Sequence, residues 1–341
     1  MFNVSNQSPA VSPALFFNTV NAYQQTAAIK AAIALDLFTA LGKAAETAQS
    51  LAAKCKTSER GMRILCDYLV ILGFLTKQAE HYSLTPDSAI FLDQHSPAYV
   101  GKAIEFLLSP TLTDAFKDIA AAVRNGGTIL PEAGTLAPED PVWVKFARAM
   151  APMMALPAQL IAQLIHTDTS KSLQVLDISA SHGLFGITLA QHHPNAQVVA
   201  VDWPNVLEVA RENAQAAGIS DRYTTIAGSA FEVDYGSGYD WVLLPNFLHH
   251  FDAATCETLL KKIHRALAAD GQVITVEFIP NEDRVSPPEA AAFSLVMLGT
   301  TPNGDAYTFE EFKQMFSHAG FSSSELHALP PTPQQVVISR K

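Results

Sequence analysis

The first hundred residues repeat their apolar side chains at the spacing of helices. Between Ala27 and Leu41 apolar residues recur every three or four positions, and Gly42 follows them. This pattern predicts one amphipathic helix that ends at the glycine. Two shorter helices are predicted over residues 48–54 and 58–72, joined by a three-residue turn.

A short hairpin is predicted after these helices and completes the pattern of a winged helix. Residues 74–76 and 82–85 are the two candidate strands, and a polar turn separates them. Many winged helices bind DNA through a basic helix. Here residues 1–100 contain seven basic and seven acidic side chains, and the helix over 58–72 is apolar around most of its circumference. We therefore expect a subunit interface in this region and disfavour DNA binding.

After residue 170 the pattern changes to alternating strands and helices. Candidate strands lie at 173–178, 197–202, 223–227, 240–245 and 272–278, with helices at 183–191, 204–217 and 253–268. The strands are rich in Val, Ile and Leu, as parallel strands covered on both faces are. A capping box at Thr308 and Glu311 predicts a further helix, and strands at 322–328 and 335–339 follow it. The pattern predicts an α/β fold with a parallel, Rossmann-like sheet and a C-terminal strand pair.

The segment between these regions is predicted to be mostly helical and ends in a Met-rich stretch. The chain is therefore expected to have three parts. They are an α-helical winged-helix dimerisation domain over 1–105, a helical connector that contributes to the substrate pocket over 106–168, and an α/β domain over 169–341.

Composition narrows the range of partners. Only 16% of the 341 residues are charged, which leaves apolar surface to bury against another chain. The net charge of −11 and the lack of a basic run disfavour nucleic acid and anionic membranes. No apolar stretch approaches the roughly 20 residues of a membrane span, and the first basic residue, Lys30, comes too late for a signal peptide. Three scattered cysteines, Cys55, Cys66 and Cys256, indicate free thiols in a reducing cytoplasm.

The turn after the first α/β strand is where an open parallel sheet binds its ligand. It reads VLDISASHGLFG, and it has Ser179, Ser181 and Leu184 where a dinucleotide fingerprint needs glycines. A nicotinamide cofactor is therefore disfavoured. A nucleoside ligand needs mainly an acid for its ribose hydroxyls, and Asp202 ends the second strand, where such an acid belongs. The alternatives are that Asp177 only orders the loop and that Asp202 caps the next helix.

Five segments, taken in order, resemble the small-molecule O-methyltransferases that use S-adenosylmethionine. They are VLDISASHG, VVAVDWPNVLEVA, LPNFLHHFD, ALAADGQVITVE and MLGTTPNGDAYTFEEFKQMFSHAGF. The family includes plant caffeate and hydroxyindole enzymes and bacterial antibiotic-tailoring enzymes. The resemblance covers nearly the whole chain, and it implies S-adenosyl-L-methionine as cofactor, a class I methyltransferase domain over 169–341 and a homodimer formed through the N-terminal domain.

The resemblance also implies a set of cofactor-binding residues. Asp202 is expected to hold the ribose diol, the loop 179–183 to pass beside the methionine portion, and residues 228–231 to lie along the adenine. The candidates are Asp177, Ser179, Gly183, Asp202, Trp203, Gly228, Ser229, Phe231 and Asn246. Two departures from the family stand out. Ser179, Ala180 and Ser181 replace glycines, so that a Cβ crowds the cofactor unless φ is negative, and the uncharged Ser229 replaces an acid.

Two adjacent histidines follow the fourth strand. Transfer of a methyl group to a hydroxyl requires a base for the departing proton, which is ordinary histidine chemistry. His249 matches the family's base, and His250 replaces its acidic neighbour; the alternative is that backbone carbonyls satisfy both rings. Glu277 is expected to orient the base, or else to be a pocket-edge carboxylate. The family's second glutamate aligns with Ala306, which leaves Asp305 as a weak substitute.

Apolar side chains near these positions favour a flat apolar acceptor, since no cluster of Arg or Lys is present to hold a phosphate. The substrate-binding candidates are Phe146, Met150, Met153, Phe247, Phe293 and Met297, with Asn246 beside the base, and ordinary core packing is the alternative for each. We expect a cytoplasmic O-methyltransferase that acts on the hydroxyl of a small aromatic molecule without a metal. The alternatives are C- or N-methylation by the same architecture and a catalytically inactive nucleoside-binding scaffold or regulator.

Overall fold

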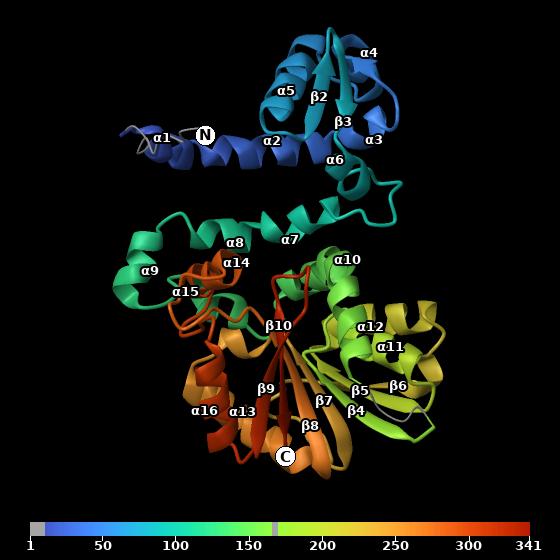
Figure 1. Cartoon of the computed structure of the whole chain (residues 1–341), viewed down its shortest axis with the longest axis vertical. Coiled ribbons are helices and arrows are strands. Elements are labelled where there is room, and N and C mark those ends of the chain that lie inside the picture. The colour runs from blue at the N-terminus through green and yellow to red at the C-terminus, as the bar shows by residue number, and fades with distance from the viewer. Residues whose placement is uncertain (1–10, 166–169) are drawn as a thin grey trace, which may run out of the picture. The chain divides into compact units, whose positions relative to one another are not determined.

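The computed structural model describes residues 11–165 and 170–341. These residues divide into two compact units, the first ending at Gly101 and the second beginning at Lys102. Figure 1 shows their helices and strands. The helices predicted as a connector belong to the second unit, and the predicted boundary between 168 and 169 lies outside the described residues.

The first unit packs helices around a small antiparallel sheet. Its helices are α1 (Ala14–Val20), α2 (Ala22–Ala34), α3 (Leu37–Leu41), α4 (Ala48–Lys54), α5 (Glu59–Ile71) and α6 (Pro86–Phe91). Its strands β1 (Glu46–Thr47), β2 (Leu75–Gln78) and β3 (His81–Leu84) pair in the order β1-β3-β2. The predicted order of two helices and a hairpin is present, and its identification as a winged helix stays a prediction.

The prediction of a single helix from Ala27 to Leu41 is wrong, because the chain forms the two helices α2 and α3 there. Asp36, between α2 and α3, has a φ of 53°. That left-handed conformation cannot continue a right-handed helix. The next two helices begin as expected, because the hydroxyls of Thr47 and Ser58 accept hydrogen bonds from backbone N–H groups in the first turns of α4 and α5.

The second unit contains a sheet of seven strands across the described residues. They are β4 (Leu173–Ile178), β5 (Ala196–Asp202), β6 (Tyr223–Ala227), β7 (Tyr239–Pro245), β8 (Leu267–Glu277), β9 (Ser323–Ala328) and β10 (Gln335–Arg340). Their order is β6-β5-β4-β7-β8-β10-β9. The strands β4 to β8 are parallel, and β10 lies antiparallel to both β8 and β9. The predicted Rossmann-like sheet with a C-terminal antiparallel strand pair is confirmed.

Helices cover both faces of this sheet. The helices of the second unit are α7 (Ile104–Leu107), α8 (Pro110–Ala115), α9 (Ile119–Asn125), α10 (Pro141–Leu164), α11 (Leu184–His192), α12 (Pro204–Ala216), α13 (Ala253–Ala266), α14 (Pro288–Ala291), α15 (Phe293–Thr300) and α16 (Phe309–His318). Short 3₁₀ turns are η1 (Gly101–Ala103), η2 (Pro131–Leu136), η3 (Ser220–Arg222) and η4 (Leu248–His250). In Figure 1 α10, α11 and α12 lie on one side of the sheet, and α13 and α16 lie on the other.

Alternate residues of the central strands enter two separate hydrophobic cores. On β7, Trp241 and Leu243 pack with α10, α11 and α12, whereas Val242 and Leu244 pack with α13 and α16. Burial on both faces explains why the strands read as continuous apolar runs. The capping box predicted at Thr308 and Glu311 is confirmed at the start of α16.

Candidate active site

The candidate site lies at the carboxyl edge of the parallel strands. In the strand order, β4 has β5 on one side and β7 on the other, so the order reverses at β4. Ligands of open α/β sheets bind where the order reverses. The carboxyl ends of β4, β5, β7 and β8 carry the loop 179–183, Asp202, the turn 246–250 and Glu277, respectively.

Asp202 connects the ends of two neighbouring strands. Its Oδ2 accepts a hydrogen bond from the N–H of Ser181 at 2.8 Å, and its Oδ1 accepts one from the N–H of Trp203 at 2.7 Å. It does not cap α12, because Trp203 is the N-cap and no side chain caps that helix. Each carboxylate oxygen retains a lone pair for a further donor. Burial raises the pKa of Asp202 to about 6.

Asp177 lies fully buried beneath the same loop. Its Oδ2 accepts a hydrogen bond from the N–H of Gly186 at 3.0 Å, which orders the first turn of α11. Its Oδ1 has no hydrogen-bond partner within the described part of the chain. Burial, followed by the charge of Asp202, raises the pKa of Asp177 to about 8. The loop-ordering alternative thus describes one of its two oxygens.

The buried Asp177 makes the ligand-free protein less stable as pH rises. The unfolded chain ionises this carboxyl near pH 4, whereas the folded chain keeps its proton up to about pH 8. Stability is therefore lost between these values, by up to roughly 1.4 kcal/mol per pH unit. Asp177→Asn removes the titration, so its unfolding free energy relative to wild type should increase between pH 5 and 7. Urea titrations at several pH values measure this difference, and parallel curves for the two proteins would contradict it.

The loop after β4 keeps a left-handed backbone without its glycines. Ser179 and Ser181 have φ values of 56° and 52°, so neither takes a negative φ. Such a conformation costs a non-glycine residue roughly 1–2 kcal/mol. At Gly183, with a φ of 74°, a Cβ would come within 2.6 Å of the Tyr223 hydroxyl, so glycine is required there. The Ser181 Oγ is buried and has no partner among the described residues.

The remaining cofactor candidates surround Asp202 and the end of β7. The N–H of Gly228 donates to the carbonyl of Asp202 at 2.9 Å, which places residues 228–231 beside that strand end. The Ser229 hydroxyl accepts a bond from the N–H of Phe231 at 3.3 Å and so orders its own turn. Asn246, with a φ of 53°, begins the turn that carries the histidines.

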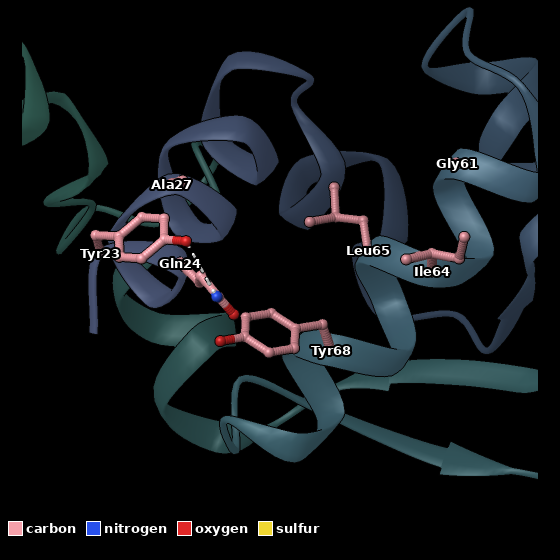
Figure 2. Close-up of a pocket in the computed structure, with 7 residues that line it drawn as sticks. All are labelled: Tyr23, Gln24, Ala27, Gly61, Ile64, Leu65 and Tyr68. Atoms are coloured by element: carbon pink, nitrogen blue, oxygen red, sulfur yellow. Dashed lines mark hydrogen bonds between the residues drawn. The ribbon is translucent and has the colours of Figure 1, made fainter. Parts of the chain in front are cut away.

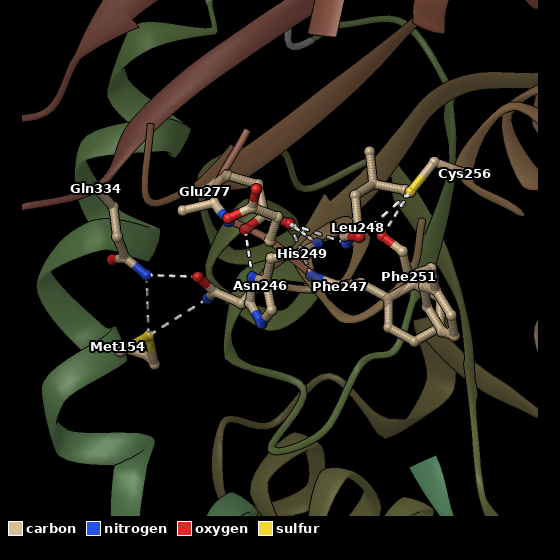
Figure 3. A network of polar contacts seen from close by, with 11 residues as sticks. Met154, Asn246, Phe247, Leu248, His249, Phe251, Cys256, Glu277 and Gln334 are labelled. Carbon is tan, nitrogen blue, oxygen red and sulfur yellow. Dashed lines mark hydrogen bonds and ion pairs between the residues drawn. The ribbon is translucent and has the colours of Figure 1, made fainter. Parts of the chain in front are cut away.

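His249 and Glu277 form a buried pair at the centre of this edge. The His249 Nδ1 lies 2.5 Å from the Glu277 Oε2. The other oxygen, Oε1, accepts bonds from the N–H groups of Phe247, Leu248 and His249 at 3.0, 2.9 and 3.4 Å (Figure 3). Donors at both oxygens suit an ionised carboxylate, which only accepts. Glu277 is fully buried, and both of its oxygens face these donors. With Nδ1–H directed at Glu277, the lone pair of His249 is on Nε2.

His250 lies against the base but differs from it in its surroundings. The centroids of the two histidine rings are 4.3 Å apart. The His250 ring meets the Trp143 ring edge-on, with 5.3 Å between their centroids. Burial, followed by the neighbouring His249, lowers the pKa of His250 well below its usual value. Its Nδ1 has no partner in the described residues, so no backbone carbonyl satisfies that nitrogen. A ring with so low a pKa holds an added proton weakly, so His250 is a poor general base.

Glu277 is the carboxylate that contacts His249, and the substitute considered at residue 305 is engaged elsewhere. Asp305 is 40% exposed and forms an ion pair with Arg284 at 3.4 Å. Ala306, at the position of the family's second glutamate, is buried.

Aromatic side chains surround the histidines. The Phe293 ring lies 4.8 Å from the His249 ring and stacks on Phe278. Phe146 contacts Trp143, which faces His250. Phe293 therefore contacts the candidate base directly, and Phe146 is separated from His250 by the Trp143 ring.

The other substrate candidates have different environments. Met150 is buried with Phe146 in one apolar cluster, and Phe247 packs against Phe231 and Phe251. Met297 is buried in α15. Met153 is 40% exposed.

Sequence reasoning missed Trp143, Phe278 and Gln334. The i, i+3 spacing of Trp143 and Phe146 on one helix was an available signal. Gln334 offers no local signal, because its partner Asn246 is 88 residues away. Phe278 directly follows Glu277, and no pattern separates it from ordinary strand-end packing.

The described ranges of the chain contain neither a candidate membrane span nor a candidate metal site. None of their helices is both long and apolar enough to cross a membrane. No three of their His, Cys, Asp and Glu side chains are grouped so that they could hold a metal ion.

Comparisons with known proteins agree over most of the chain. A model of the O-methyltransferase domain matches residues 116–322, and a model of the O-methyltransferase dimerisation domain matches residues 17–94. A solved structure from Nostoc punctiforme, of a protein whose O-methyltransferase activity is itself inferred, is 67% identical. It has a TM-score of 0.95 and covers 97% of this chain and 100% of its own.

Two more distant proteins extend the comparison. The 3-hydroxy-5-methyl-1-naphthoate 3-O-methyltransferase of Streptomyces sahachiroi is 28% identical, and the match covers 91% of this chain and 90% of the relative. The structure of human N-acetylserotonin methyltransferase in complex with S-adenosylmethionine is 21% identical, with a TM-score of 0.83. It covers 98% of this chain and 99% of its own, and it shares the fold.

Proposed function

This chain belongs to the O-methyltransferase family, and we propose that it transfers a methyl group from S-adenosylmethionine to a hydroxyl of a small aromatic acceptor. The observation that carries this proposal is the buried contact between the His249 Nδ1 and Glu277 at the carboxyl edge of the sheet. It is supported by the O-methyltransferase domain match over residues 116–322.

The residues at the edge of the sheet fit the cofactor. Asp202 has a free lone pair on each oxygen after its bonds to the N–H groups of Ser181 and Trp203, and a ribose diol offers two O–H donors. The buried Ser181 hydroxyl, which lacks a partner among the described residues, can bond to the methionine portion. When bound, S-adenosylmethionine supplies a methyl group on a positively charged sulfur, and that sulfur leaves as a neutral thioether.

His249 accepts the proton that the acceptor hydroxyl loses as its oxygen binds the methyl carbon. Its Nε2 takes this proton, because Nδ1 is held by the Glu277 carboxylate at 2.5 Å. The ring then carries a positive charge, which the adjacent carboxylate stabilises. Glu277 is itself held by three backbone N–H groups, so the ring has a fixed orientation.

The surroundings of His249 favour an aromatic acceptor. The Phe293 ring beside His249 and the Trp143 ring beside His250 offer flat apolar surfaces. The naphthoate named for the Streptomyces sahachiroi relative is an acceptor of this kind.

A methylation screen tests the proposed reaction. The protein is incubated with S-adenosylmethionine that carries a labelled methyl group and with a panel of phenols, naphthols and hydroxyindoles. We expect label on the oxygen of at least one acceptor. Label on carbon or nitrogen alone would establish the alternative reactions, and calorimetry that detects no binding of S-adenosylhomocysteine at millimolar concentration would contradict a methyltransferase.

We also propose that the chain forms a homodimer through its first unit. An apolar groove of about 390 Å³ lies between α2 and α5 and is lined by Tyr23, Gln24, Ala27, Gly61, Ile64, Leu65 and Tyr68 (Figure 2). The adjoining helix α1 leaves Leu15 and Phe16 80% and 64% exposed. Apolar side chains this exposed favour burial against a second copy, and the dimerisation-domain match over residues 17–94 supports that partner.

Ile64→Asp is expected to dissociate this dimer. Ile64 is 43% exposed and lines the groove, so the variant would bury an unpaired charge at the interface. We expect the dissociation constant to increase about 100-fold or more. Analytical ultracentrifugation measures this constant. The matched control is Val285→Asp at a 71% exposed position of the second unit, and equal dissociation constants for the two variants would contradict the assignment.

The three cysteines are consistent with a cytoplasmic location, which we propose for the enzyme. All three are free thiols, and Cys66 and Cys256 are buried. A reducing compartment maintains this state.

A further inference from the structure

We propose that Gln334 is a positioning residue that holds the histidine-bearing turn in place through Asn246. Gln334 lies between β9 and β10 and is 2% exposed. Its Nε2 donates a hydrogen bond to the Asn246 Oδ1 at 2.7 Å. Because the turn carries His249, this inference rests on the proposed function.

The amide contact is part of a set that joins three distant segments. The Gln334 Nε2 lies 3.9 Å from the Met154 sulfur, and the Asn246 Nδ2 lies 3.8 Å from the same atom. Figure 3 shows the Met154, Asn246 and Gln334 side chains pointing toward one another beside the His249–Glu277 pair. The C-terminal strand pair, the histidine-bearing turn and α10 thus meet at these side chains.

Asn246 is the residue that changes the direction of the chain. Its N–H donates to the carbonyl of Val276 at 2.7 Å and extends the pairing of β7 with β8 by one residue. Its φ of 53° then turns the backbone out of the strand. The next three N–H groups converge on the Glu277 Oε1 as a result. Asn tolerates this conformation better than most residues, and its side chain needs a partner to stay fixed.

Loss of the Gln334 amide would leave the histidine-bearing turn less constrained at Asn246. The Asn246 Oδ1 would lose its partner, and the Asn246 side chain would be free to rotate. A shift of the following turn would change the contact between His249 and Glu277, on which the proton affinity and tautomer of the base depend. A side chain that only stabilised the fold would change the melting temperature and leave the ring of His249 as it is.

Two variants separate these readings. Gln334→Ala removes the contact with Asn246, and Gln335→Ala removes a comparable bond from the neighbouring glutamine to the Ile279 carbonyl at 2.8 Å. The titration and tautomer of His249 are followed by NMR of the ligand-free protein with ¹⁵N-labelled histidine, well below the melting temperature. We expect Gln334→Ala to shift the His249 titration midpoint by about half a pH unit or more, and Gln335→Ala to leave it unchanged.

A double-mutant cycle tests whether Gln334 acts through Asn246. With an acceptor identified by the screen, Gln334→Ala should lower kcat about 10- to 100-fold and change KM less. When Gln334→Ala is added to Asn246→Ala, kcat should fall by less than about twofold below that of Asn246→Ala alone. The proposal would be overturned if Gln334→Ala matched Gln335→Ala in both the His249 titration and kcat. It would also be overturned if Gln334→Ala lowered kcat by the same factor in the wild-type and Asn246→Ala backgrounds. If wild type methylates none of the acceptors, the proposed function fails, and the NMR titration still decides the role of Gln334.

Discussion

Replacing His249 with alanine lowers kcat/KM for a phenolic acceptor by about 10²- to 10⁴-fold, the usual contribution of a general base. The loss is expected because the His249 Nε2 is directed away from Glu277 and is the nitrogen available for the acceptor proton. The variant should still bind S-adenosylhomocysteine, since the Asp202 contacts belong to another strand end. Steady-state kinetics and calorimetry measure the two effects.

His250 provides the matched control for this substitution. Its ring is buried beside the same turn, and its lowered pKa keeps it neutral at working pH. His250→Asn is expected to reduce kcat/KM less than about tenfold, because it removes no proton acceptor. An equal loss in the two variants would remove His249 from its assigned role.

Asp202→Ala raises the dissociation constant for S-adenosylhomocysteine by about 100-fold or more. If Asp202 holds the ribose as proposed, the variant loses two charge-assisted hydrogen bonds to it, each contributing roughly 1.5–3 kcal/mol. It also releases the N–H of Ser181, which Asp202 holds at 2.8 Å, so the loop 179–183 loses a contact that fixes it. Calorimetry with the folded variant measures the change.

Asp240 is a suitable control for the binding experiment. Its Oδ2 also accepts a bond from a backbone N–H, that of Gln174, at 2.8 Å. This contact lies at the amino ends of β4 and β7, the opposite edge of the same sheet. Asp240→Ala should therefore leave the affinity unchanged. Tight binding by Asp202→Ala, or equal losses in the two variants, would contradict the assigned ribose contact.

The fold could be predicted where local patterns determine it. Continuous apolar runs predict the parallel strands because both faces of the sheet are buried. The capping box at Thr308 and Glu311 marks the start of α16 because two orphan donors are satisfied within one turn. The helix predicted from Ala27 failed because the left-handed Asp36 leaves no trace in the apolar spacing.

The candidate site could be predicted only in part. Strand ends bring His249 and Glu277 together, since β7 and β8 are neighbours with carboxyl ends at one edge. The left-handed φ of Ser179 could not be predicted, because the surrounding loop overrides the preference of serine. The Gln334 contact depends on how a distant connection folds back, which no local pattern records.

The most direct test of the central claim compares two phenols of matched shape with wild type and with His249→Ala. One phenol is neutral at the assay pH, and the other carries an electron-withdrawing group and is already ionised. If His249 removes the acceptor proton, the substitution lowers kcat/KM by about 10²-fold or more for the neutral phenol and by less than about fivefold for the ionised one. Equal losses for both phenols would contradict the claim.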